Sequence, residues 1–270
     1  PHIDINELYK RGSWLELVER AKDQIKESSR DAATQKMIKR AIYNRILTCD
    51  DHSYLLFLKH LCQSGFVVND EGSRQALMSH YDFWQKTGPE SGFDSVAKSL
   101  VKLKQFDIAE ELLDVLDWQL EQTKHEQLTM DNLYDVPLKL HARYAREQIL
   151  VAFGATTFER QSPAREGIFV IKEQNIELMF VTLDKNEKQF SPTTMYHDYA
   201  INESVFHWQS QNSSRPDKGR GKDYIRHKEI DKRLFLFVRE QAKDALGRTM
   251  GFVNYGEVEY ISHSGSQPMN

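Results

Sequence analysis

Residues 168–181 read IFVIKEQNIELMFV, so that two apolar runs flank the polar residues Glu173-Gln174-Asn175. Two β-prone runs joined by a short polar turn are typical of a β-hairpin. Two further β-prone runs follow, LFLFV at residues 234–238 and GFVNY at residues 251–255. From about Arg165 onward, the sequence therefore predicts a compact, mixed β domain with a short helix inside it.

The first part of the chain has a different periodicity. Up to about Leu120, apolar residues recur at the spacing of one helix face, in segments near residues 14–18, 38–46, 55–62, 76–84 and 106–116. This pattern favours a helical bundle or short helical array. A polar, poorly periodic stretch at residues 121–137 is interpreted as a linker. A last helix is expected over residues 144–153, ended by Gly154.

Together, the two patterns predict an α+β protein in which helices and strands are segregated. We expect a helical coupling domain at residues 1–140 and a β-rich domain at residues 141–270. The chain starts at Pro1 without an initiator Met, which suggests a fragment of a longer protein.

The composition indicates a folded protein with no membrane partner. Hydrophobic residues make up 40 % and charged residues 28 % of the 270 residues, as in globular proteins. No apolar run approaches the roughly 20 residues that a membrane helix needs. The cysteines, Cys49 and Cys62, form neither a metal-binding spacing nor a disulfide framework, so we expect a reducing, cytoplasmic location.

The net charge of −4 hides an asymmetry between the two parts. Residues 1–140 carry 18 Lys and Arg against 23 Asp and Glu, a balance of −5, whereas residues 141–270 carry 18 against 17, a balance of +1. Eight basic residues and four acidic ones lie between Arg215 and Arg233. A charge run often marks no more than a solvated surface. This one is of interest because of the residues that precede it.

Residues 191–211 contain the densest group of chemically informative side chains, including YHDY at 196–199 and FHWQ at 206–209. Flat aromatic rings stack on nucleobases, while amides and carboxylates hydrogen-bond to base edges. The candidate base pocket consists of Tyr196, Asp198, Tyr199, Trp208 and Gln209. A 5-methyl group would fit a small apolar recess beside Ile201 or Met195. On chemistry alone, the alternative remains open that these rings are core residues with satisfied polar tips.

The basic run that follows supplies candidate contacts to DNA phosphates. These residues are Arg215, Lys218, Arg220, Lys222 and Arg226. Gly219 and Gly221 are interpreted as keeping this loop flexible.

Several common catalytic and cofactor-binding motifs are absent from the chain. It contains no phosphate-binding loop, Gly-x-Ser-x-Gly elbow, His-Glu-x-x-His helix or Cys-x-x-Cys pair. We therefore expect neither ATP binding of the helicase type nor a cofactor or metal, and the chain itself is not expected to be an enzyme. A less favoured alternative is a cryptic metal-dependent nuclease built from His197, Asp198 and His207.

Several linear motifs resemble a bacterial domain family of unknown function that follows a phospholipase-D-like nuclease and a superfamily-two helicase. They are RYAREQIL at 143–150, FVTLDK at 180–185, YHDYAI at 196–201, FHWQSQ at 206–211, YIRH at 224–227 and LFVRE at 236–240. Some proteins of this architecture are type IV, modification-dependent restriction enzymes of the SauUSI kind. Those enzymes attack DNA that carries 5-methylcytosine.

The resemblance implies a helical coupling region followed by a mixed β-barrel-like domain of the SRA or PUA type. It also implies a bacterial phage-defence protein whose DNA cleavage and ATP hydrolysis lie in nuclease and helicase domains of the same polypeptide. The predicted function is a target-recognition module that binds double-stranded DNA and reads 5-methylcytosine by base flipping. The alternative is a non-catalytic coupling or oligomerisation module of a bacterial helicase.

Overall fold

The structure is a computed structural model of the chain, and it describes residues 4–14, 16–17, 30–70, 72–123, 128–130, 133, 135–162, 167–184 and 198–270. The chain divides into two compact units. Unit 1 comprises Pro1–Pro163 and Lys243–Gly251, and unit 2 comprises Ala164–Ala242 and Phe252–Asn270. This division falls after the last helix of the first part, whereas the sequence placed the boundary between residues 140 and 141.

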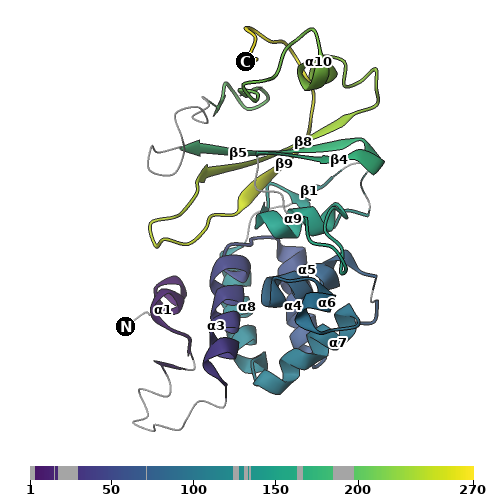
Figure 1. Cartoon of the computed structure of the whole chain (residues 1–270). Coiled ribbons are helices and arrows are strands. Elements are labelled where there is room, and N and C mark those ends of the chain that lie inside the picture. The colour runs from purple at the N-terminus through teal and green to yellow at the C-terminus, as the bar shows by residue number, and fades with distance from the viewer. Residues whose placement is uncertain are drawn as a thin grey trace. The chain divides into compact units, whose positions relative to one another are not determined.

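Unit 1 is built mainly from helices (Figure 1). Helix α4 packs on α8, and α5 packs on α3, α7 and α9. The helices are α1 (Ile5–Arg11), α3 (Ala32–Ala41), α4 (His52–Gln63), α5 (Arg74–Trp84), α6 (Gly88–Ser91), α7 (Val96–Val101), α8 (Ala109–Gln122) and α9 (Arg146–Ala152), with the π-helical turn η1 (Ile42–Ile46) and the 3-10 turn η2 (Lys102–Phe106). The α+β class predicted from the sequence is confirmed.

Short polar side chains fix where the helices of unit 1 begin. The carboxylate of Asp31 accepts the Thr34 backbone N–H at the start of α3, and that of Asp51 accepts the Ser53 and Tyr54 N–H groups at the start of α4. Helix α9 ends before Gly154, which has φ of 71°. The stretch interpreted as a linker contains the end of α8 and the strand β1 (Leu128–Thr129), which pairs with β2 (Lys139–Leu140).

Two ionisable side chains of α5 are buried in unit 1. Asp82 accepts hydrogen bonds from the Tyr54 hydroxyl and the Gln148 amide, and burial raises the pKa of its carboxyl to about 6. His80 bonds to the Ser99 hydroxyl and the Lys86 carbonyl, and burial lowers the pKa of its ring to about 4. Desolvation therefore disfavours the charged form of both groups.

The segment Lys243–Gly251 belongs to unit 1 although it connects two strands of unit 2. Arg248 explains this placement. Its guanidinium pairs with Asp244 at 2.8 Å, donates to the Leu47 carbonyl at 3.2 Å and lies over the ring of Tyr43. These contacts tie the segment to the start of the helical array.

Unit 2 is organised around a sheet in which four of its strands have the order β9-β8-β5-β4. The predicted hairpin is confirmed: β4 (Ile168–Ile171) and β5 (Ile176–Asp184) are antiparallel and joined by the turn η3 (Lys172–Gln174) and Asn175, which has φ of 52°. Strand β8 (Arg233–Gln241) pairs in parallel with β5, and β9 (Phe252–Val258) is antiparallel to β8.

The sequence resemblance implied a barrel-like domain, but the described strands do not form a barrel. Their sheets are open, and β4 is an edge strand that pairs only with β5 among the described strands. The short strands β6 (Tyr199–Ala200) and β7 (Phe206–His207) pair with each other and do not extend the sheet. Closure requires the two edges of a sheet to pair, which these strands do not do.

Helix α10 (Gly219–Ile225) and the residues around β7 cover one face of this sheet (Figure 1). Alternation along β5 and β8 directs one set of apolar side chains toward them. That core consists of Ile168, Met179, Val181, Tyr224, Leu234, Leu236 and Val238, with Val170, Phe206, Trp208 and Val258 packed against it. The side of α10 that carries Tyr224 is thereby fixed on the sheet.

Across the described ranges, no helix has both the length and the apolar character needed to cross a bilayer. Cys49 and Cys62 are both buried and form no disulfide.

Candidate nucleic-acid interface

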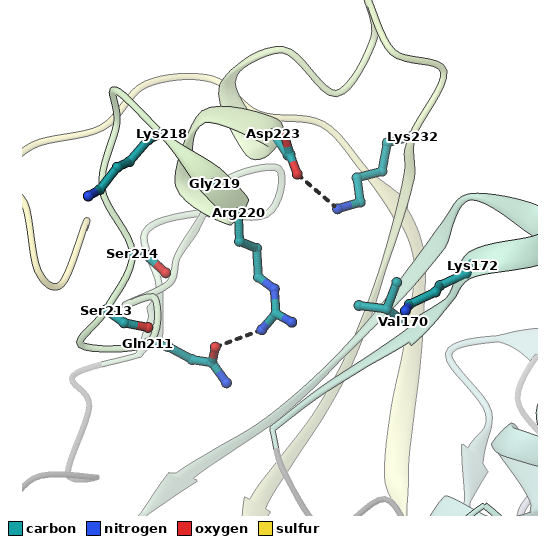
Figure 2. Close-up of a pocket in the computed structure, with 10 residues that line it drawn as sticks. All are labelled: Val170, Lys172, Gln211, Ser213, Ser214, Lys218, Gly219, Arg220, Asp223 and Lys232. Carbon is teal, nitrogen blue, oxygen red and sulfur yellow. Dashed lines mark hydrogen bonds and ion pairs between the residues drawn. The ribbon is translucent and has the colours of Figure 1, made fainter.

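An open pocket of about 670 Å³ lies in unit 2 between α10, the loop before it and the β4 edge of the sheet. Its lining includes the cations Lys172, Lys218, Arg220 and Lys232 and the carboxylate of Asp223, with Gln211, Ser213 and Ser214 as neutral polar groups. Figure 2 shows the Arg220 guanidinium extending from α10 into the middle of this space, with Gln211 on one side and Val170 and Lys172 on the other. The lining is therefore polar and predominantly cationic.

The loop wall of the pocket is held in place by backbone contacts. Ala or any larger residue at Gly221 would place a Cβ 2.3 Å from the Arg215 carbonyl oxygen, so only glycine lets α10 approach the loop this closely. The Gln267 N–H donates to the Ser214 carbonyl at 3.0 Å. Gly219 and Gly221 were expected in a loop, but they belong to α10, which begins at Gly219.

A buried ion pair forms the inner side of the pocket. The Lys232 ammonium lies 2.8 Å from the Glu177 carboxylate, and their side chains are 8 % and 0 % exposed. The Tyr224 hydroxyl donates to the other Glu177 oxygen at 2.5 Å. Burial, together with this carboxylate, raises the pKa of Tyr224 well above its usual range. Lys232 is therefore fixed, and its second carboxylate neighbour is Asp223 at 4.0 Å.

The five basic residues predicted to contact DNA phosphates fall into two groups. Arg215 forms two hydrogen bonds of 2.9 Å to Asp217, and this pairing lowers the pKa of Asp217. Arg226 pairs with Glu229 at 2.5 Å. By contrast, Lys218, Arg220 and Lys222 form no ion pair within 4 Å among the described residues, and Arg220 instead donates to the neutral Gln211 at 2.6 Å.

Sequence reasoning missed Lys172 and did not select Lys232. Lys172 lies in the turn after β4, far from the basic run in sequence, and it enters the pocket only because the hairpin lies beside α10. Nothing in its local sequence distinguishes it from other surface lysines. Lys232 lies within the basic run, but its burial depends on Glu177, which is on another strand.

The predicted base pocket is only partly within the described residues, because Tyr196 and Met195 lie outside them. Asp198 is 8 % exposed, and its carboxylate accepts the Gln209 backbone N–H at 2.8 Å. Tyr199 is 51 % exposed and stacks on His207 with ring centroids 4.6 Å apart. Ile201 is exposed.

Trp208 packs on different residues from the Tyr199–His207 pair. Its ring packs on the core of unit 2 and meets the ring of Tyr224 edge-on, with centroids 5.2 Å apart. Tyr199 thus stacks on His207, whereas Trp208 packs against the core.

The residues of the nuclease alternative are not assembled into a metal site in the part of the chain that the structure describes. Asp198 is engaged with the Gln209 backbone, His207 stacks on Tyr199, and His197 lies outside the described residues. No group of three or more His, Cys, Asp or Glu able to hold a metal ion occurs among the described side chains.

The family comparison covers the unit that carries this pocket. Residues 138–270 form a DUF3427 domain, described as a domain of unknown function. No curated protein and no solved structure matches the chain. The DUF3427 domain includes the motifs that resemble a bacterial domain family of unknown function, and the pocket beside α10 lies entirely within it.

Proposed function

We propose that unit 2 is a module that binds duplex DNA and holds its phosphate backbone with the side chains around α10. The observation that carries this proposal is a group of cations that form no ion pair within 4 Å among the described residues: Lys172, Lys218, Arg220 and Lys222. Unpaired cations attract phosphates and release condensed counterions when DNA binds. Such contacts supply affinity and register, while base contacts supply specificity.

The resemblance to type IV restriction enzymes supports a finer proposal. In it, the module belongs to a bacterial, cytoplasmic phage-defence protein and selects DNA that carries 5-methylcytosine. Nuclease and helicase domains of the same polypeptide then cut and move along the DNA, while this chain contributes binding rather than catalysis. The proposed kinship with SRA- and PUA-type readers rests on the linear motifs.

Base reading would involve Tyr199 rather than Trp208. The half-exposed Tyr199 ring, supported from behind by His207, offers a face on which an extruded base can stack. Stacking of one base on an aromatic ring contributes about 1–3 kcal/mol. Trp208 is occupied by the core of unit 2, and Asp198 by the Gln209 backbone. Flipping therefore needs a further partner for the base besides Tyr199.

The second candidate function is a coupling or oligomerisation module of a bacterial helicase. Phe206 and Trp208 are partly buried and pack against the core of unit 2, and this structural role of both aromatic residues favours the coupling module. The two candidates differ in whether the isolated chain binds DNA.

The decisive experiment measures the affinity of the 270-residue chain for a labelled duplex over a range of salt concentrations. Each lost phosphate contact lowers the log–log salt slope by about 0.9, so removal of four contacts should lower it by about 3 to 4. We expect this loss when Ala replaces Lys172, Lys218, Arg220 and Lys222. Duplexes with and without 5-methylcytosine, measured in parallel, test the finer proposal.

The matched control removes four paired cations from the same unit. The substituted residues are Arg215, Arg226, Lys228 and Arg233. Their carboxylate partners are, in the same order, Asp217, Glu229, Glu259 and Glu257. The net charge changes equally in both variants, but we expect the control to change the slope by less than about one unit. Equal slopes in the two variants would exclude α10 as the phosphate-binding region. Absence of DNA binding by the parent chain would favour the coupling module.

A further inference from the structure

In the pocket beside α10, cations from separate parts of the chain lie around one recess. Arg220 comes from α10, Lys172 from the turn after β4, and Lys232 from the residue before β8 (Figure 2). The four lining cations, including Lys218, outnumber the single lining carboxylate, Asp223, which gives a balance of +3. Glu177, behind Lys232, reduces this to +2. A recess with this charge suits a multiply charged anion.

The available donors match a phosphate group. Arg220 uses one terminal nitrogen on Gln211, and its other N–H groups have no partner among the described residues, which leaves them free for a bidentate contact. The hydroxyl side chains of Ser213 and Ser214 also line the recess. An internal phosphodiester of DNA carries one negative charge, whereas a phosphomonoester carries about 1.5 to 2 near neutral pH. The balance of charge favours the monoester.

The size of the pocket indicates that the ligand is larger than a phosphate ion. A volume of about 670 Å³ lies within the range of small-molecule sites, about 300–1,000 Å³. Val170 supplies an apolar wall opposite Arg220 (Figure 2). There is therefore room for a sugar and base attached to the phosphate.

We infer that this pocket binds the phosphomonoester of a nucleotide, with Arg220 and Lys172 on the phosphate and Lys232 held at the inner wall. The ligand is either the phosphorylated end of a DNA strand or a free mononucleotide, because both present the same group. In its strand-end form, the inference rests on the proposed DNA-binding function and extends it from internal phosphates to a terminal one.

The test compares ligands that differ only in this phosphate. The 270-residue chain is titrated with one hairpin duplex carrying a 5′-phosphate, a 3′-phosphate or no phosphate, and separately with deoxycytidine 5′-monophosphate and deoxycytidine. We expect at least one phosphorylated ligand to bind tenfold or more tightly than its unphosphorylated counterpart. A preference confined to the hairpin identifies a strand end as the ligand, and one confined to the monophosphate identifies a free nucleotide.

Two pocket variants and one control locate the effect. Arg220→Gln and Lys172→Gln should each remove the preference for the phosphorylated ligand, and Lys172 is exposed in a turn, so its replacement leaves the fold intact. Lys222 lies on the same helix but does not line the pocket. Lys222→Gln should therefore weaken binding of all DNA ligands alike and keep the preference.

The outcomes separate this inference from the proposed function. Equal affinity for every phosphorylated and unphosphorylated pair overturns the phosphomonoester site, even if the chain binds DNA. A preference that survives both pocket substitutions also overturns it. Binding of the monophosphate without binding of any DNA supports the pocket and refutes the DNA-binding module.

Discussion

Replacement of Lys232 by Met tests the buried ion pair that supports the pocket. Met keeps a side chain of similar length but removes the ammonium, which lies 2.8 Å from the Glu177 carboxylate. Glu177 is fully buried, so among the described residues of unit 2 the hydrogen bond from Tyr224 would then be the contact that stabilises its charge. We expect the variant to be destabilised because a buried charge without its partner cannot recover its lost hydration.

The expected magnitude follows from the burial of both partners. Removal of one member of a buried ion pair costs about 3–5 kcal/mol, whereas replacement of both members by neutral groups costs far less. The double variant Lys232→Met, Glu177→Gln keeps an acceptor for the Tyr224 hydroxyl and removes the uncompensated charge. It should therefore recover at least about 2 kcal/mol of the loss.

Hydrogen exchange measured by mass spectrometry is the suitable assay, because it reports on each unit separately. Peptides from β5 and β8 should lose protection in the single variant and regain most of it in the double variant. Peptides from α4 and α8, which belong to unit 1, serve as the internal control. The reasoning would be refuted if Lys232→Met lowered the stability of β5 and β8 by less than about 1 kcal/mol, or if the double variant were no more stable than the single one.

Two further predictions concern buried groups and close packing. Asp82 has a folded pKa of about 6, so as the pH falls from about 6.5 to 4 it gains its proton first in the folded state, which stabilises the fold. His80 has a folded pKa of about 4, so over the same range it gains its proton first in the unfolded state, which destabilises the fold. The two effects oppose each other in the parent, and Asp82→Asn removes the stabilising one. In urea unfolding, the free energy of unfolding of unit 1 should therefore fall by about 3 kcal/mol more in the variant than in the parent over this pH range. If the free energy of unfolding depends on pH in the same way in the parent and the variant, the prediction is contradicted. Gly221→Ala should destabilise α10 by about 1–3 kcal/mol or more, because its Cβ would meet the Arg215 backbone. The Cβ of Gly219→Ala would meet no atom within 4 Å, so this control variant is strained only by its φ of 57°, which costs about 1–2 kcal/mol. An equal loss of α10 amide protection in both variants would argue against the close contact at Gly221.

The sequence by itself determined the elements whose interactions are local. The hairpin of β4 and β5 follows from two apolar runs and a short polar turn, and Asn175 adopts the left-handed conformation that Asn tolerates better than most residues. The helices of unit 1 follow from apolar residues at helical spacing. In each case, the residues that interact are separated by a few positions, so their pattern is visible along the chain.

Only the tertiary structure decided which side chains meet around the pocket. Parallel pairing of β5 with β8 brings Glu177 beside Lys232, and the hairpin turn brings Lys172 beside Arg220. The sequence left open whether Trp208 is a core residue or stacks on a base, and in the tertiary structure it packs against the core of unit 2. These outcomes depend on contacts between residues distant in sequence, whose energies come from the packing of the whole unit and not from any local pattern.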